Sequence, residues 1–147
     1  MHRKRLFLIG LTVCAAVSLT LGGCASSGRA HAKTNTDVTK TVAKMLAMTA
    51  SAPLLFKDTT ATKSLAKSIT ETSNLKFALI LDRDLKQVSE CFLIPSQPDS
   101  MEIVNSIQKR VRSGGTEFSF SENGLTVSVV PIREADQLLG YAAVGAM

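Results

Sequence analysis

The sequence contains no tryptophan, one tyrosine, two histidines and three cysteines. Both histidines, His2 and His31, precede residue 36, where patterned sequence begins. The rest of the chain therefore has no Ser-His or Cys-His pair for nucleophilic catalysis and no histidine to hold a metal. It also lacks a Cys-x-x-Cys motif, which excludes the common redox and haem-attachment sites. These absences indicate a protein that is not an enzyme and has no metal or cofactor.

The N-terminus has the pattern of an export signal. Residues 1–5 are basic, and the uncharged run 6–21 is shorter than the ~20 residues of a typical membrane span. Leu21-Gly22-Gly23-Cys24 then resembles the lipobox of bacterial lipoprotein signal peptides. The resemblance implies that 1–23 are a signal peptide, that Cys24 carries lipid, and that the lipid binds the protein to a membrane. The alternative is an uncleaved anchor helix in which Cys24 is incidental.

The expected location is the cell envelope. Ala25, rather than Asp, after Cys24 resembles lipoproteins sorted to the outer membrane in enterobacteria-like cells. In a Gram-negative host the domain would then be lipid-anchored at the outer membrane and would face the periplasm. Residues 24–35 are small and polar, without apolar periodicity, which predicts a flexible lipidated tether.

Removal of the signal changes the charge and the cysteine inventory. Residues 1–23 hold three basic residues and no acid, so the net charge falls from +5 to +2. So small an excess gives no argument for nucleic-acid binding. Cys14 leaves with the signal and Cys24 is lipidated, so Cys91 has no partner for an intramolecular disulfide. We interpret Cys91 as a small buried apolar residue.

Two helices are predicted after the tether. The first begins at Asn35 or Thr36 and ends or kinks at Pro53. Its apolar positions recur at helical spacing and predict an inner face of Val38, Val42, Met45, Leu46 and Thr49. The second covers 60–73, with Leu65 and Ile69 on its inner face.

Five strands and one further helix follow. Strands are predicted at 76–82 and 87–94 around an Asp-rich turn, and a helix over 99–112 with Val104, Ile107 and Val111 inward. Phe118 and Phe120 begin a strand that turns at Asn123-Gly124, and the final strand, 138–146, follows a polar turn at 133–137. The order predicts a single α+β domain, 36–147. It is a five-stranded antiparallel sheet with N-terminal helices and one helix between strands two and three.

This element order, and the segments "APLLFKD", "LKFALILDRDLKQVSE" and "VSVVPIREADQLLGYAAVG", resemble extracytoplasmic PAS-like sensor domains of the Cache type. The resemblance covers 36–147 and implies a module that senses or binds a small molecule. Such receptors continue into a membrane helix and a signalling domain, whereas this chain stops at Met147. We therefore expect signalling through a membrane-protein partner, and a homodimer through the N-terminal helix. The alternative is an accessory lipoprotein that uses the fold as an interaction surface.

Four residues are candidates for ligand binding: Arg110, Phe118, Phe120 and Tyr141. Aromatic side chains can line a pocket and a cation can hold an anionic group, but core packing of the rings and a solvated helix end for Arg110 are alternatives. The acids Asp82, Asp84 and Glu90 are too widely spaced for a calcium loop and indicate a solvated hairpin.

Overall fold

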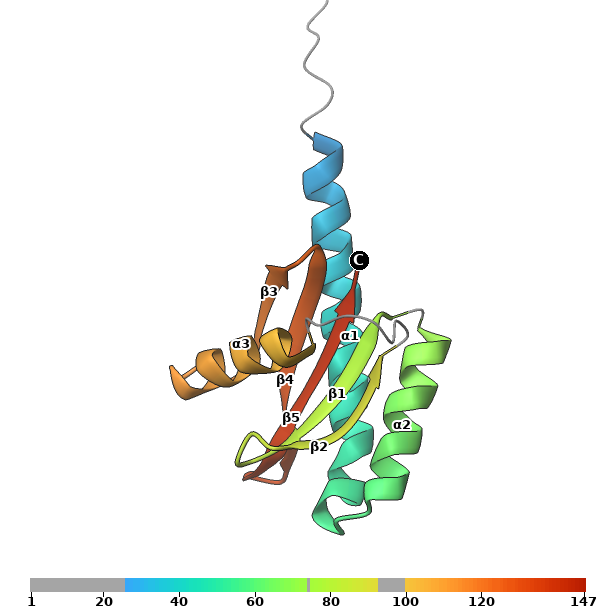
Figure 1. Cartoon of the computed structure of the whole chain (residues 1–147), viewed down its shortest axis with the longest axis vertical. Helices are drawn as coiled ribbons and strands as arrows, with labels where there is room; N and C mark the ends of the chain where they lie inside the picture. The colour runs from blue at the N-terminus through green and yellow to red at the C-terminus, as the bar shows by residue number, and fades with distance from the viewer. Residues whose placement is uncertain (1–25, 74, 93–99) are drawn as a thin grey trace, which may run out of the picture.

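The computed structural model describes residues 26–73, 75–92 and 100–147, which form one layered domain (Figure 1). Its elements are α1 (Ser26–Leu55), α2 (Thr59–Thr72), β1 (Phe77–Asp82), β2 (Gln87–Phe92), α3 (Ser100–Arg112), β3 (Phe118–Glu122), β4 (Leu125–Glu134) and β5 (Gln137–Ala146). The strands form one antiparallel five-stranded sheet in the order β2-β1-β5-β4-β3. The predicted α+β architecture is therefore confirmed.

Helices cover both faces of this sheet, α1 and α2 on one side and α3 on the other (Figure 1). The central strands accordingly read as continuous apolar runs: the first five residues of β1 are all buried. Small residues permit the close packing, because Gly145 of β5 faces the ring of Phe77 on β1 and a Cβ there would enter the ring. The Phe77 ring occupies the space that the missing side chain of Gly145 leaves.

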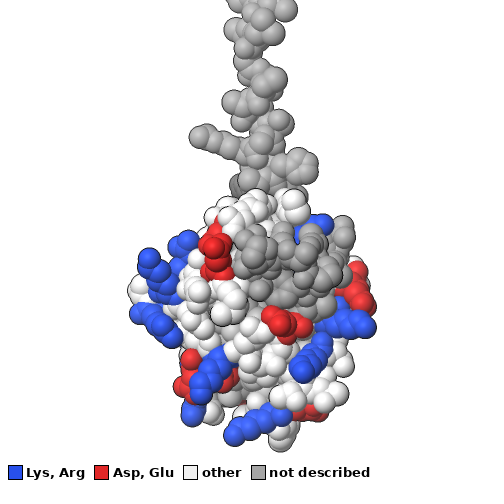
Figure 2. Space-filling view, viewed as in Figure 1, with Lys and Arg blue, Asp and Glu red and all other residues white. Residues whose placement is uncertain are grey.

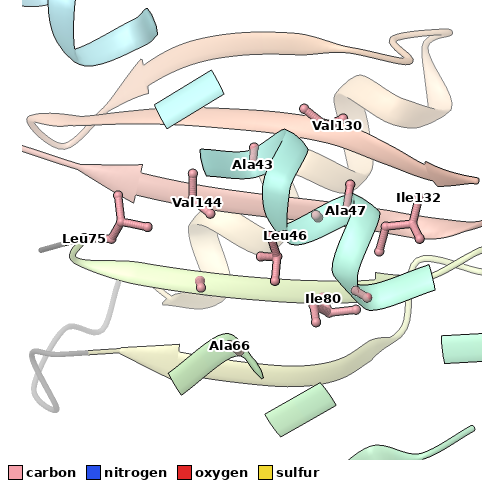
Figure 3. Packing of buried hydrophobic residues seen from close by; sticks show 12 residues of the cluster. Ala43, Leu46, Ala47, Ala66, Leu75, Ile80, Val130, Ile132 and Val144 are labelled. Carbon is pink, nitrogen blue, oxygen red and sulfur yellow. The ribbon is translucent and has the colours of Figure 1, made fainter. Parts of the chain in front are cut away.

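The buried face of α1 differs from the predicted one. Leu46 is buried and Val42 partly buried, as predicted, but Val38, Met45 and Thr49 point to solvent. The helix also buries Thr39, Ala43, Ala47 and Ala50, which were not predicted. Figure 3 shows Ala43, Leu46 and Ala47 directed at Val130, Ile132 and Val144 of the sheet. The alanines face the sheet because their short side chains let the helix axis lie close to the strands. The longer apolar side chains form a second face of α1, which is exposed.

Both ends of α1 also differ from expectation. The helix begins at Ser26, so the segment expected to be an unstructured tether is helical from that residue. Once the packed part of a helix has formed, each added residue such as Ala30 or Ala32 extends it at little cost. Residues 1–25 lie outside the described part of the chain, so the signal peptide, its cleavage and the lipid on Cys24 stay predictions. No helix among the described residues is long and apolar enough to span a bilayer.

At its other end, α1 continues through Pro53 to Leu55. The N–H of Asp58 donates to the carbonyl of Pro53 at 2.8 Å, and that of Lys57 to Leu54 at 3.2 Å. Lys57 has a φ of 56°, which is the left-handed residue of a Schellman cap. The proline therefore removes a bond only in the final turn, and the cap, two residues beyond Leu55, ends the helix.

The second helix, α2, buries Thr62, Ala66 and Thr70, with the predicted Leu65 and Ile69 only partly buried beside them. The threonines are tolerated because their hydroxyls are used within the helix: Thr70 Oγ1 donates to the carbonyl of Ala66 at 2.7 Å. For α3 the prediction holds, since Val104 and Ile107 are buried and Val111 packs against them.

A buried chain of hydroxyls joins α1 to the sheet. Thr39 Oγ1 lies 2.7 Å from Ser128 Oγ on β4, which lies 2.8 Å from Ser119 Oγ on β3. Thr39 and Ser128 are fully buried. Since buried polar groups are costly when unpaired, this chain fixes the position of α1 along β4.

A surface ion cluster adds to the same contact. Lys40 Nζ and Lys44 Nζ of α1 lie 2.9 and 3.2 Å from Oε1 of Glu117, just before β3. The hydrogen bond from Lys40 is the largest cause that lowers the pKa of Glu117, and the same bond raises the pKa of Lys40. The cluster thus links the outer side of α1 to the far edge of the sheet.

Candidate functional site

A half-open cavity of about 470 Å³ lies at the end of the sheet where three turns meet. They are the α1–α2 corner, the β1–β2 turn and the β4–β5 turn, at the lower end of Figure 1. We call it the distal cavity. It is lined by Leu54, Leu55, Lys57, Thr59, Asp82, Arg83, Asp84, Val88, Gln137, Leu138 and Leu139. The volume is in the range of small-ligand sites.

Gly140 of β5 lies against Leu54 and Asp82, two residues that line the distal cavity. A Cβ at this position would run into the carbonyl of Leu81 and would lie 3.0 Å from Leu54 Cδ2. The glycine therefore lets β5 lie directly against β1 and the end of α1. Leucine side chains from α1 and β5, with Val88 from β2, supply the apolar part of the lining.

The β1–β2 turn forms one wall of the distal cavity, and Asp82 stabilises this turn. Its Oδ1 accepts the backbone N–H groups of Asp84 and Lys86, at 2.9 and 2.8 Å. Leu85 takes a left-handed φ of 62°, which closes the turn. The carboxylate of Asp82 is thus engaged by the backbone, and the turn presents Arg83 and Asp84 to the cavity.

The opposite wall is the start of α2. Asp58 is its N-cap and accepts the N–H of Ala61 at 2.9 Å, while Thr59 and Lys57 face the cavity. Lys57 adopts a backbone conformation that glycine would adopt at lower cost. Residues in strained backbone conformations are common at functional sites, so the Lys57 side chain is a candidate for contact with a ligand.

The charged groups on the rim are free to meet a ligand. Within the described residues the ion pairs are those of Lys40 and Lys44 with Glu117 and of Lys67 with Glu71, so Lys57, Arg83 and Asp84 take part in none. On the face shown in Figure 2, acidic and basic side chains are interspersed. The distal cavity therefore offers apolar contact together with single charges of both signs.

The structure brings together three of the four residues predicted to bind a ligand. Arg110 Cζ, in the last turn of α3, lies 4.5 Å from the ring centre of Phe120, and the rings of Phe118 and Phe120 are 6.1 Å apart. Tyr141 belongs to the core cluster against which Phe118 and Phe120 pack, but it is nearly buried in the middle of the sheet, beside Leu81 and Pro131. None of the four lines the distal cavity, and their role in ligand binding stays a prediction.

The sequence did not point to the distal cavity. It predicted the two polar turns, but not that they meet each other and the corner between α1 and α2. They meet because β5 pairs with β1, which brings the β4–β5 turn to the same end of the sheet as the β1–β2 turn. That pairing joins strands separated by about half of the domain, and only the full strand order would have revealed it.

The fold is similar to that of a sensor domain of known structure. A search of curated proteins found no match. The sensor domain of DcuS from E. coli superposes with a TM-score of 0.52 at 16% identity, over 78% of this chain and 90% of that domain. The ligand-binding domain of the Campylobacter jejuni chemoreceptor Tlp3, solved with L-valine, gives 0.43 at 10% identity, over 81% of this chain and 60% of the other. The family model of the CHASE8 periplasmic sensor domain matches residues 30–144, and the chain therefore belongs to that family.

Proposed function

We propose that this periplasmic sensor domain is a lipid-anchored module that binds a small molecule in the distal cavity and signals through a membrane-protein partner. The observation that carries the proposal is the cavity itself, which combines an apolar lining with Lys57, Arg83 and Asp84, three side chains that form no ion pair with another described residue. This lining suits a compact molecule with an apolar body and a charged group. No catalytic activity is part of the proposal.

The cavity also suggests how a signal would leave the domain. Leu54 and Leu55 belong to the last turn of α1, the helix that leads back toward the N-terminus. A ligand that favours one packing of this turn would shift the population of α1 positions that a partner meets. The homodimer expected through α1 would bring two such helices together.

The proposed anchor rests on Leu21-Gly22-Gly23-Cys24. Two or three acyl chains hold a protein firmly, because each buried CH₂ contributes ~0.8 kcal/mol. In a Gram-negative host we propose the outer membrane, with the domain facing the periplasm. Replacement of the thiol by Cys24→Ser should leave an unprocessed precursor that takes up no labelled fatty acid. Normal processing and membrane retention of this variant would contradict the anchor.

A thermal-shift screen of metabolites tests the ligand site. A ligand at about 100 times its dissociation constant should stabilise the protein by ~2.7 kcal/mol. Thr59→Trp, at an exposed position on the cavity rim, should abolish the response by filling the cavity. The matched control is Arg110→Gln, on the other face of the sheet, which should respond as the wild type does.

Two outcomes would overturn the cavity assignment. If Arg110→Gln loses the response and Thr59→Trp keeps it, the ligand lies at the α3–β3 edge, where Arg110, Phe118 and Phe120 meet. If no ligand in a broad set shifts the melting temperature, the accessory role becomes the better proposal. The observation that favours it is the exposed apolar surface of Met45, Met48 and Phe56, which are 58%, 79% and 79% exposed.

A further inference from the structure

Two strands that border the distal cavity each contain a β-bulge, where the strand has one residue more than its partner. In β2 the extra residue is Val88, whose two neighbours pair with consecutive residues of β1. In β5 it is Leu139, whose two neighbours pair with consecutive residues of β4. Both extra residues line the distal cavity. Bulges of this kind are common beside functional sites, where they redirect a side chain.

Each bulge directs its extra side chain toward α1 and α2. Side chains of a regular strand point alternately to the two faces of the sheet. Ser89 lies on the α2 face, since its Oγ donates to the carbonyl of Thr62 at 3.3 Å, yet its neighbour Val88 packs against the core on the same face. Leu139 would share the α3 face with Tyr141 in a regular strand, but it packs against the core under α1. The bulges therefore place two branched apolar side chains on one face of the sheet, within the lining of the cavity.

Unfavourable backbone conformations gather at the same end of the sheet. Among the described residues other than glycine, four have a positive φ, and three of them lie in the turns around the cavity. These are Lys57, Leu85 and Ala135, at 56°, 62° and 49°. The fourth, Asn123, lies in the two-residue hairpin turn, which requires a positive φ. Because such conformations cost free energy and cluster at ligand sites, their concentration here supports a binding role for the distal cavity.

Positive groups border the cavity on two opposite walls. Lys57 belongs to the α1–α2 corner and Arg83 to the β1–β2 turn. Thr59, the first residue of α2, also lines the cavity, so the positive end of this helix dipole borders it. Of the two acids in the lining, Asp82 already accepts two backbone N–H groups of its own turn, which leaves Asp84 as the acid for a ligand to meet. The charges of the lining therefore favour an anionic head group.

We propose that the distal cavity takes an aliphatic anion and that Val88 and Leu139 limit the length of its carbon chain. Both side chains pack against the same core cluster as Leu54, which also lines the cavity, so together they form its apolar end. The anionic head group then lies at the rim, between Lys57 and Arg83. A chain gains contact with each carbon atom until it meets the bulge residues, and a longer chain must displace them. This role rests on the proposed ligand site, but not on the anchor or on a partner.

Straight-chain alkanesulfonates, from ethanesulfonate to octanesulfonate, serve as the probe, because they are anionic at any pH used for binding. Thermal-shift titrations of the detergent-solubilised full chain give a dissociation constant for each. This constant should fall by roughly fourfold with each added methylene until the chain reaches Val88 and Leu139, and should then stop falling. Straight-chain amines should bind about tenfold more weakly, or worse, at every length. Thr59→Trp fills the cavity and should bind neither series, which separates the cavity from uptake by the detergent.

Truncation of either bulge residue should lengthen the chain that the cavity accepts. Leu139→Ala and Val88→Ala each make room in the lining, so the dissociation constant should go on falling for about two further methylenes. The matched control Val111→Ala truncates a partly buried side chain on the α3 face and should leave the limit unchanged. Arg83→Gln should weaken the binding of every sulfonate by roughly tenfold and also leave the limit unchanged. Two independent truncations keep the test decisive where one of them does not fold.

Three outcomes would count against this assignment. If the limit stays the same in Leu139→Ala and Val88→Ala, these residues do not select the chain. If the amines bind more tightly than the sulfonates, the ligand is not an anion. If neither series binds while the metabolite screen finds a ligand that Thr59→Trp excludes, the aliphatic anion is wrong and the cavity site stands. If that screen finds no ligand either, the proposed function fails together with this assignment.

Discussion

Ser128 offers the sharpest test of how α1 is held on the sheet. Its Oγ is the middle of the buried hydroxyl chain, 2.7 Å from Thr39 and 2.8 Å from Ser119. Ser128→Ala removes two hydrogen bonds at a site with no exposed surface. At about 1 kcal/mol for each bond, the free energy of unfolding should fall by ~2 kcal/mol. For a domain of this size, that lowers the melting temperature by roughly 8 °C.

A double-mutant cycle with Thr39→Val separates the hydrogen bond from general packing. Thr39→Val alone should cost about 1 kcal/mol or more, because it leaves the Ser128 hydroxyl with one partner fewer. The double variant should cost less than the sum of the two single variants, by ~1 kcal/mol, since the second change removes a bond already lost. Urea denaturation followed by circular dichroism measures all three. Additive losses, or a Ser128→Ala variant as stable as the wild type, would refute a structural role for the chain.

Three further predictions follow from contacts described above. Gly145→Ala should lower the free energy of unfolding, measured by urea denaturation, by ~1–3 kcal/mol, because its Cβ meets the ring of Phe77. The same substitution should lower this free energy less in a Phe77→Leu background. An equal loss in both backgrounds would contradict the contact. Glu117 has a lowered pKa in the folded state, so its small contribution to stability should be present above pH 4.5 and fade as the pH falls further. Lys40 has a raised pKa, so its contribution should fade at the alkaline end; melting curves of Glu117→Gln should lack both dependences. Lys57→Gly should raise the free energy of unfolding by ~0.5–1 kcal/mol by relieving a left-handed backbone, and a loss of stability would show that the side chain supports the fold.

Most helices and strands could be predicted because residues close together in the sequence determine them. The Asn123-Gly124 turn is an example: both residues have positive φ, 52° and 77°, as the two-residue hairpin requires. The apolar run of β1 and the capped, amphipathic α3 were equally local in origin. These features depend on neighbours in the chain, and no tertiary contact overrides them.

The inner face of α1 was predicted only in part: Leu46 and Val42 lie on it, whereas Val38, Met45 and Thr49 do not. The reason is physical. Periodicity finds the most apolar stripe of a helix, and α1 has two apolar stripes. The stripe of larger residues, with Val38 and Met45, faces outward, whereas the alanine-rich stripe lies on the strands. Choosing between them requires the distance between helix and sheet, which a sequence pattern does not contain. The distal cavity was missed for a related reason, since it depends on which strands pair.

The hydrogen bond between Asn35 and the end of the chain has a practical consequence. Asn35 Nδ2 donates to the carbonyl of Met147 at 3.0 Å, so the C-terminus lies beside the N-terminal half of α1 (Figure 1). The three turns around Lys57, Arg83 and Gln137 lie at the opposite end, ~28 Å away along the helix. A fluorescent protein or affinity tag joined after Met147 would start from the end remote from these turns and leave them accessible to binding measurements.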